Sequence, residues 1–242
     1  MTKIIKLYLD IGCSYQGDDY IENIYRDIEN WNIKDCGIIS MLKLEIDPQK
    51  RTTEEVSFKQ ILGPMYKKFK CSIKDYRKYT SCILKEFKDV NLFVTFNGRD
   101  FDIPIIINNL NLSKDNKDYH IKYFTYRDRD LLDLCIIKDI PVKGGLKEIT
   151  RRLKIDYNFK IDYNLIGYNL VDCNLVDYDE KGEEDVYFLD NFDQNVSRYN
   201  SCLITRKRRN ESEIRALPLL EEKLGFLYEP RSFIDRYHKK WI

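Results

Sequence analysis

The chain carries almost no net charge and few of the residues that build the commonest enzyme sites. Its 41 Lys and Arg side chains balance 40 Asp and Glu side chains, which leaves a formal charge of +1. Such a chain has no long-range attraction to a polyanion, so any affinity for nucleic acid must come from local basic clusters. His120 and His238 are too far apart to form a histidine-based metal or nucleophile site. A Gly-rich phosphate loop, a Gly-x-Ser-x-Gly and a His-Glu-x-x-His pattern are all missing.

The seven cysteines are not arranged for a disulfide framework or a structural zinc site. They are odd in number, scattered and never spaced as Cys-x-x-Cys, so we expect reduced thiols. No segment approaches the ~20 apolar residues of a membrane span. The apolar run at residues 4–9, interrupted by Lys6 and closed by Asp10, is too short for a secretory signal. We therefore expect a soluble, cytoplasmic protein with no membrane partner.

The sequence does contain enough apolar residues for one large folded domain. Hydrophobic residues make up 43% of the 242 positions, and a chain of this length buries roughly 73% of its unfolded surface. Apolar runs and helical spacing predict an α/β protein, with a mixed sheet flanked by helices and antiparallel first strands. The expected strands are 4–11, 37–46, 56–62, 91–96 and 121–126; the expected helices are 20–31, 72–87, 101–110, 145–153, 186–203 and 211–224.

Residues 155–179 repeat an apolar-Asp-Tyr-Asn pattern at intervals of five to six residues. This interval fits neither a strand nor a solenoid repeat. We interpret the segment as a variable insertion and assign no function to it.

Two carboxylates stand where apolar strands end. Asp10 closes the first expected strand, and Asp102 follows the turn at Asn97 and Gly98 after a later strand. Sites of open α/β sheets form at strand ends, and two carboxylates in one cleft can bind Mg²⁺. Either residue alone could instead be a helix cap or a turn residue.

Four segments resemble motifs of one protein family. Residues 94–104, Val-Thr-Phe-Asn-Gly-Arg-Asp-Phe-Asp-Ile-Pro, closely resemble the second exonuclease motif of YprB-like proteins, which are RNase H-fold members of the DEDD 3′–5′ exonuclease superfamily. Residues 7–11 are similar to the first motif, residues 130–134 to an Asp-Leu-Leu segment, and residues 145–153 to the helix after it. The order and rough spacing agree over residues 4–205.

The resemblance implies a fold, a site and a substrate. It implies an RNase H-like mixed sheet flanked by helices in a domain at 1–205, and we expect residues 206–242 to form a basic, helical C-terminal extension packed on it. In this family four carboxylates hold two Mg²⁺ or Mn²⁺ ions, which activate water and stabilise the leaving 3′ oxygen. The resemblance thus implies catalytic, metal-binding roles for Asp10 and Asp102, and the end of a single-stranded DNA or RNA as partner.

The sequence departs from the family pattern at two of the four carboxylates. Gly12 stands where the first motif has Glu, two residues after Asp10. The family's late-helix pattern, Tyr-Asn-x-x-Asp-Val, is best matched at residues 191–196, which puts Asn195 at the position of the Asp. A substitute carboxylate could come from the loop after the first strand or from the neighbouring strand. The candidates are Asp18, Asp19, Glu22 and Glu45, with Asp193 available only in another register.

Basic residues and one Asn are candidates for nucleic-acid contacts. Arg206, Lys207, Arg208 and Arg209 form the densest basic run; Arg151, Arg152 and the motif residue Asn97 complete the set. Basic side chains can contact phosphates without reading sequence. Each cluster could equally be a solvated surface near a helix C-terminus.

Two functions stay open on these residues. The chain is either a metal-dependent 3′–5′ exonuclease or an inactive pseudo-exonuclease that binds nucleic acid or protein. A third carboxylate close to both Asp10 and Asp102 would favour the enzyme, whereas a ring completed only by Gly12 and an Asn would favour the binding module.

Overall fold

The computed structural model describes residues 3–14, 35–62, 73–155 and 196–229. Its centre is a five-stranded sheet with the strand order β3-β2-β1-β4-β5. The strands are β1 (Ile4–Ser14), β2 (Asp35–Asp47), β3 (Thr52–Leu62), β4 (Leu92–Thr95) and β5 (Asp128–Asp130). Strands β1, β2 and β3 pair antiparallel, whereas β4 and β5 run parallel to β1. The predicted mixed sheet with antiparallel first strands is confirmed.

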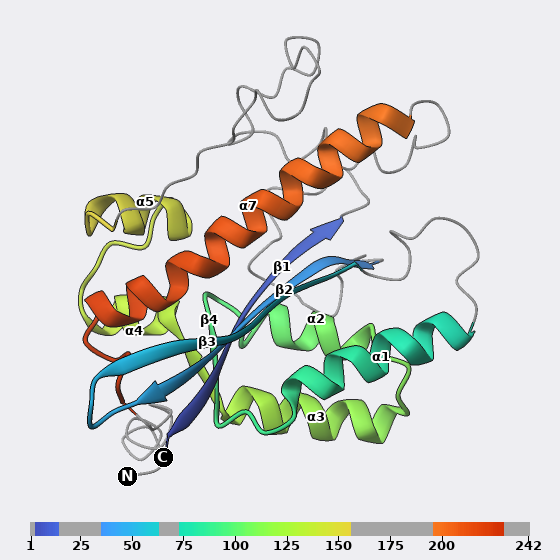
Figure 1. Ribbon diagram of the computed structural model, residues 1–242, viewed down its shortest axis with the longest axis horizontal. Coiled ribbons are helices and arrows are strands. Elements are labelled where there is room, and N and C mark those ends of the chain that lie inside the picture. The colour runs from blue at the N-terminus through green and yellow to red at the C-terminus, as the bar shows by residue number, and fades with distance from the viewer. Residues whose placement is uncertain (1–2, 15–34, 63–72, 156–195, 230–242) are drawn as a thin grey trace.

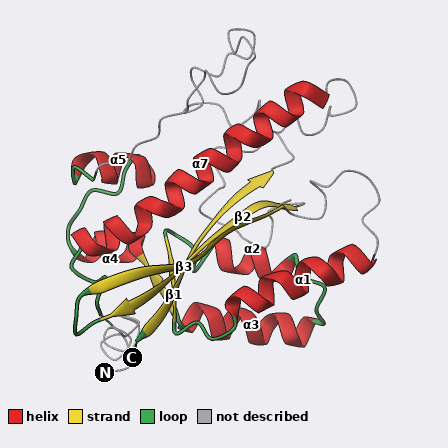
Figure 2. Ribbon diagram, viewed as in Figure 1, coloured by secondary structure: helices red, strands yellow, loops and turns green. Residues whose placement is uncertain are grey.

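Helices cover both faces of the sheet (Figures 1 and 2). One face carries α1 (Ile73–Phe87), α2 (Asp102–Asn108) and α3 (Lys114–Tyr126); the other carries α4 (Leu131–Ile137), α5 (Gly145–Arg152) and α7 (Val196–Lys223). Each face has its own apolar core. The predicted α/β class, a mixed sheet flanked by helices with a C-terminal helix, is therefore confirmed.

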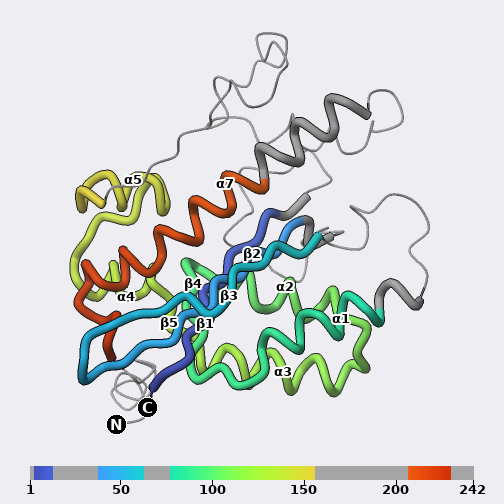
Figure 3. The backbone as a smooth tube through the Cα atoms, in the orientation of Figure 1, coloured from blue at the N-terminus to red at the C-terminus, as the bar shows by residue number. Residues whose placement is uncertain are grey.

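Strand β1 sends alternate side chains to the two cores. Leu7 and Leu9 pack in the core beneath α1, α2 and α3, while Tyr8 packs in the core beneath α7. Side chains two residues apart share a face of a strand, so Lys6 and Asp10 also point toward α7. Both contact that helix directly. Figure 3 shows β1 and α7 side by side, although most of the sequence separates them.

A buried cluster of charges joins α7 to the sheet. Glu221 of α7 accepts hydrogen bonds from Lys6 Nζ at 2.7 Å, from the Tyr8 hydroxyl at 2.5 Å and from Arg129 Nη1. Lys6, Tyr8 and Glu221 are fully buried and Arg129 is 1% exposed. Burial lowers the pKa of Lys6 to about 8 even though Glu221 stabilises its charge. The Glu221 carboxylate is thus shared by two cations on two strands.

Backbone carbonyls after α7 complete the shell around the two cations. Lys6 Nζ donates to the carbonyl of Leu227 at 2.5 Å, and Arg129 donates to those of Phe226 at 2.8 Å and Glu229 at 3.0 Å. Buried charges are tolerated only when their hydrogen-bonding capacity is used in this way. The cluster therefore fixes both the end of α7 and the turn that follows it.

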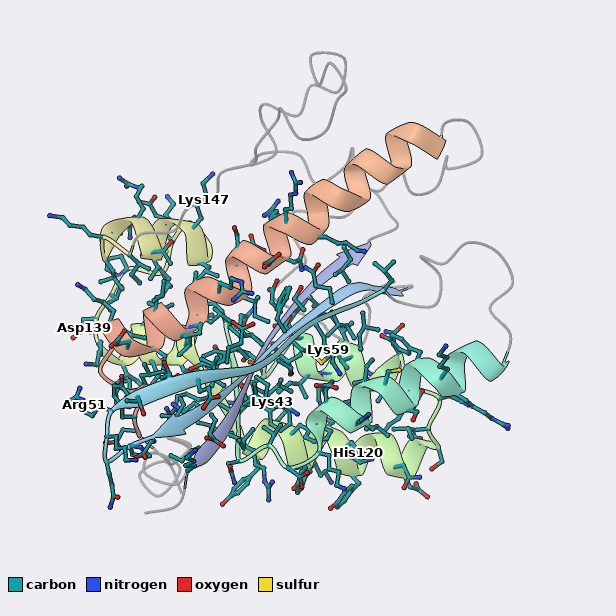
Figure 4. All side chains as sticks on the ribbon, viewed as in Figure 1. Lys43, Arg51, Lys59, His120, Asp139 and Lys147 are labelled. Atoms are coloured by element: carbon teal, nitrogen blue, oxygen red, sulfur yellow. The ribbon has the colours of Figure 1, made fainter. Side chains whose placement is uncertain are left out.

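The opposite face has a smaller ionic contact. Lys43 of β2 and Lys59 of β3, both labelled in Figure 4, pair with Glu86 of α1. Glu86 is 6% exposed, so these pairs connect α1 to the two strands where water is largely excluded. Strand β3 is the sheet edge, and its first half is exposed.

One predicted strand is wrong and one strand was not predicted. Residues 121–126, expected as a strand from their aromatic and β-branched residues, belong to α3. The helix begins after Ser113, whose side chain accepts a hydrogen bond from the Asn116 N–H at 3.4 Å, which is an N-cap. The fifth strand is instead Asp128–Asp130, three charged residues that are all buried. Apolar patterning cannot predict such a strand.

The two predicted late helices are one. Helix α7 continues through residues 204–210, where a break was expected, so the basic run lies inside the helix rather than at its end. It also continues across 205 and 206, where the expected extension begins. Pro218 lies within this helix. Among the helices that the structure describes, none has the length and apolar character needed to cross a membrane.

The expected helix at 20–31 and nearly all of the 155–179 repeat lie outside the described residues.

Replacing Glu221 by Gln tests the buried cluster. The change keeps the shape but leaves Lys6 and Arg129 without their shared carboxylate, so we expect a loss of about 3–5 kcal/mol in the free energy of unfolding. Urea unfolding measures this loss. The control is Glu222→Gln at the exposed neighbouring position, which should cost less than about 0.5 kcal/mol. Equal effects of the two changes would contradict the assigned role of Glu221.

Candidate metal and nucleic-acid site

Asp10 and Asp102 come together although they lie on different elements. Asp10 lies on β1 opposite Ser40 of β2, and Asp102 is the first residue of α2, which follows β4, the parallel neighbour of β1. Asp102 is 5% exposed. Burial raises its pKa well above the ordinary value, and repulsion from Asp10 raises it further. The two carboxylates are thus close enough for their charges to repel each other.

The segment between β4 and α2 is a tight turn that requires its own sequence. Asn97 has φ 63°, a left-handed conformation that Asn tolerates better than most residues. At Gly98 a Cβ atom would lie 2.3 Å from the Thr95 Cβ, so only glycine fits. The Gly98 N–H donates to Thr95 Oγ1 at 3.1 Å, and the Gly98 carbonyl accepts from the Ile103 N–H at 2.9 Å. The turn thereby delivers Asp102 to the start of α2.

Asp130 holds this turn in place. Its carboxylate accepts hydrogen bonds from the N–H groups of Asn97 at 2.8 Å and Arg99 at 3.4 Å, and also caps α4 by accepting from the Leu132 N–H at 2.9 Å. Burial raises the pKa of Asp130 to about 6 although these donors oppose the rise. Arg99 in turn pairs with Asp133 at 2.6 Å. The Asp-Leu-Leu-Asp segment therefore supports the turn that carries Asp102.

Helix α7 adds two polar residues to the site. Asn210 Nδ2 donates to Asp10 Oδ2 at 3.0 Å, and Asn210 is 4% exposed. After burial, repulsion from Glu213 is the largest influence raising the pKa of Asp10, and Glu213 also raises the pKa of Asp102. A third carboxylate therefore acts on both aspartates.

Glu213 was not among the candidates from the sequence, although a signal for it existed. The pattern Asn-x-x-Asp followed by an apolar residue also occurs at 210–214, with Glu213 in place of Asp and Ile214 after it. Residues at i and i+3 of a helix share a face, so Asn210 and Glu213 reach the same place. The better sequence match, at residues 191–196, includes Asn195 and Asp193, which lie outside the described residues.

Gly12 contributes no carboxylate to the site. It lies on β1 two residues from Asp10, and a Cβ atom there would be 3.3 Å from Asn210 Oδ1 and 3.4 Å from Asn210 Nδ2. The Asn210 amide therefore occupies the space into which a side chain at position 12 would grow. This packing makes Gly12 and Asn210 a matched pair.

One proposed substitute carboxylate is wrong. Glu45 pairs with Ile5 at the other end of β1, whereas Asp10 pairs with Ser40. At ~3.3 Å per residue that separation is about 16 Å along the strand, and Glu45 bonds to Lys3 instead. Asp18, Asp19 and Glu22 lie outside the described residues.

The donor chemistry of this site suits a hard divalent cation. Asp10, Asp102 and Glu213 carry carboxylate oxygens, the ligand type that Mg²⁺ and Mn²⁺ prefer, and a cation would relieve their mutual repulsion. In the part of the chain that the structure describes, no three His, Cys, Asp or Glu side chains are gathered as metal ligands. Asp10 is bonded to Asn210, and Glu213 to Arg209. A cation would therefore have to draw both carboxylates away from these partners.

The expected nucleic-acid contacts are dispersed. On α5, Arg151 and Arg152 both pair with Glu148, and the neighbouring Lys147 projects outward in Figure 4. On α7, the exposed Arg209 pairs with Glu213 at 3.0 Å.

The remaining candidates have different surroundings. Lys207 and Arg208 are half-buried, and the Lys207 carbonyl accepts from Gln60 Nε2 at 2.6 Å. The side chain of Arg206 lies outside the described residues. Asn97 serves the turn through its backbone. Of the described candidates, Arg209 is the one bonded to a carboxylate that acts on Asp10 and Asp102.

Asp128 is a further buried carboxylate next to the turn that carries Asp102. Asp128 is fully buried, with Thr95 Oγ1 at 3.0 Å from each of its carboxylate oxygens. Burial raises its pKa well above 3.8, and repulsion from Asp130 adds to the rise. The folded state therefore binds a proton at Asp128 more tightly than the unfolded chain does.

Asp128 makes folding stability depend on pH. Because its folded-state pKa is raised, the native state binds more protons above pH 3.8, so stability falls as pH rises toward the folded-state pKa. Asp128→Asn removes this contribution. We expect the free energy of unfolding to fall less steeply with rising pH, by up to ~1.4 kcal/mol per pH unit. Urea unfolding at several pH values measures it, and the exposed Asp118→Asn serves as control. An unchanged slope in the Asp128 variant would contradict the raised pKa of Asp128.

The pairing of Gly12 with Asn210 gives a second prediction. Gly12→Glu alone should not raise Mn²⁺ affinity, since the Asn210 amide, 3.3 Å from the Cβ position, crowds the new side chain. In an Asn210→Ala background the same change should raise the affinity about ten-fold, because the added carboxylate then has room beside Asp10. Calorimetric titration of all four proteins with MnCl₂ gives the coupling. Equal effects of Gly12→Glu in both backgrounds would show that the two positions are independent.

Comparison with known proteins agrees with the fold. A model of the RNase H superfamily matches residues 44–201, more than half of the 242 positions. The match includes Asp102 and the turn before it but ends before Glu213. Neither the curated proteins nor the solved structures include a match. With the family model matching most of its length, this chain belongs to the RNase H superfamily.

Proposed function

We propose that this chain is a metal-dependent 3′–5′ exonuclease of the YprB-like, DEDD type, acting on the end of single-stranded DNA or RNA. One observation carries the proposal: carboxylates from three separate elements, Asp10 of β1, Asp102 of α2 and Glu213 of α7, repel one another in one site, where Asp102 is buried and the other two are half-buried. Burying like charges together raises the energy of the folded protein. A bound cation offsets that energy, and a purely structural role would not need the third carboxylate.

Each carboxylate has a role in this proposal. Asp10, Asp102 and Glu213 hold Mg²⁺ or Mn²⁺, and Glu213 takes the place in the site that the sequence suggested was lost at Asn195. When bound, the metal supplies an activated water and a counter-charge for the leaving oxygen. Asn210 orients Asp10 through its hydrogen bond at 3.0 Å. The Asn97–Gly98 turn and Asp130 keep Asp102 in position.

A second function rests on Gly12. With no carboxylate there and the Asn210 amide filling the space, the site has three acids rather than four. Fewer ligands weaken the binding of a second ion, and two ions are needed to stabilise both the attacking and leaving oxygens. The alternative is a pseudo-exonuclease that binds the end of a nucleic acid without cleaving it.

A digestion assay with matched variants distinguishes the two functions. Single-stranded DNA and RNA, labelled at the 5′ end, are incubated with the protein and MnCl₂. The variants are Asp102→Asn and Glu213→Gln. The control is Glu211→Gln on the same helix, where Glu211 pairs with Arg215. We expect ladders that shorten from the 3′ end with the parent and the control, and a loss of at least ~100-fold with either site variant.

Other outcomes have defined meanings. Binding of the labelled strand without shortening, in parent and variants alike, supports the pseudo-exonuclease. Shortening that survives in both site variants refutes the assignment of Asp102 and Glu213. Shortening that is lost with Glu211→Gln as well would show that the effect comes from α7 as a whole.

A further inference from the structure

We propose that Arg209 is an exchangeable counter-ion of this site: it holds Glu213 when no metal is bound, and it turns to the phosphate of the terminal nucleotide when a divalent cation takes Glu213. The inference deepens the proposed function and rests on it, because it assumes the same three carboxylates as metal ligands. It assigns to one arginine opposite effects on metal binding and on phosphate binding.

The contacts of Arg209 place a cation at the edge of the acidic site. Its Nε donates to Glu213 Oε1 at 3.0 Å, and the Arg209 side chain is 45% exposed whereas that of Glu213 is 25% exposed. Arg209 thus supplies part of the positive charge that a metal would supply, and it does so from the solvent side of the carboxylates.

Competition between Arg209 and a metal follows from this position. A divalent cation bound to Glu213 neutralises the carboxylate charge that attracts Arg209. The cation and the Arg209 guanidinium also repel each other. Removing Arg209 should therefore strengthen metal binding. An exposed ion pair is weak enough to exchange, so the guanidinium can leave Glu213 without disturbing the helix.

A phosphate is the partner that the displaced arginine fits. A guanidinium presents planar donors that match phosphate oxygens, whereas a lysine ammonium acts as a point charge. The negative phosphate of a nucleotide that approaches the three carboxylates is repelled unless nearby cations screen its charge. With the metal on one side and Arg209 on the other, the phosphate of the terminal nucleotide gains two positive contacts.

Arg215 provides a matched control on the same helix. Its side chain is 42% exposed and it pairs with Glu211 one turn before it, as Arg209 pairs with Glu213 one turn after. Arg215 also pairs with Glu55 of β3 and stacks on Phe58. Its partners thus include neither Asp10 nor Glu213 among the contacts that the structure describes. A general effect of losing one positive charge from α7 would appear equally in both variants.

The test is calorimetric titration with two probes. Metal-free full-length protein is titrated first with MnCl₂ and then, at saturating Mn²⁺, with deoxyadenosine 5′-monophosphate, which carries the phosphate that exonucleolytic cleavage leaves on its product. For Arg209→Gln we expect Mn²⁺ affinity to rise about two- to five-fold and nucleotide affinity to fall about ten-fold. Arg209→Lys keeps the charge, so its Mn²⁺ affinity should match that of the parent while nucleotide affinity still falls. Arg215→Gln should change neither.

The outcome depends on the direction in which Arg209→Gln changes the Mn²⁺ affinity and the nucleotide affinity. Weaker or unchanged Mn²⁺ binding by Arg209→Gln, or nucleotide binding equal to that of the parent, overturns it, and so does the same response from Arg215→Gln. If the parent cleaves nucleic acid but Arg209→Gln shows no opposite shifts, the inference alone fails. If the parent binds no Mn²⁺, the metal site of the proposed function fails and the inference fails with it. Circular dichroism confirms that each variant is folded.

Discussion

The Glu221 carboxylate, buried between Lys6 and Arg129, is the interaction on which the arrangement of this protein depends. Two strands that are not neighbours, β1 and β5, each send one cation through the core to the same helix. An ionic cluster of this kind is a weak source of net stability, yet removing one member is costly. Its effect is to specify where α7 lies.

The candidate site follows from that position. On β1 the residues that face α7 are Lys6, Tyr8, Asp10 and Gly12, at intervals of two. The first two bind Glu221, and the third meets Asn210 eleven residues earlier on the helix. This row of side chains on β1 therefore binds α7 near the start of the strand and carries the acidic site near the end of the strand. The Asn97–Gly98 turn brings Asp102 to the same end independently, through Asp130.

Much of the fold was predictable because its strands and turns follow simple chemistry. Strands β1, β2 and β4 are apolar runs, and the Asn97–Gly98 turn has residues that only such a turn requires. Strand β5 was missed because Asp128, Arg129 and Asp130 are buried through specific partners rather than through hydrophobicity. Glu213 was missed for a related reason. The pattern at 210–214 carries a signal for it with Glu in place of Asp, but its place beside Asp10 depends on where Glu221 anchors α7.

Pro218 interrupts the backbone hydrogen bonding of α7, although the helix is continuous from Val196 to Lys223. Proline has no N–H, so the carbonyl of Ile214 lacks its intrahelical donor. This missing bond falls directly after Glu213 and before the apolar residues that lead to Glu221. The stretch from Pro218 onward is held by the core and the ionic cluster, whereas the turn before it combines the core packing of Ile214 and Leu217 with the hydrogen bond from Asn210 to Asp10. The missing bond therefore weakens the helical connection between the turn that carries Asn210 and Glu213 and the turn that Glu221 anchors.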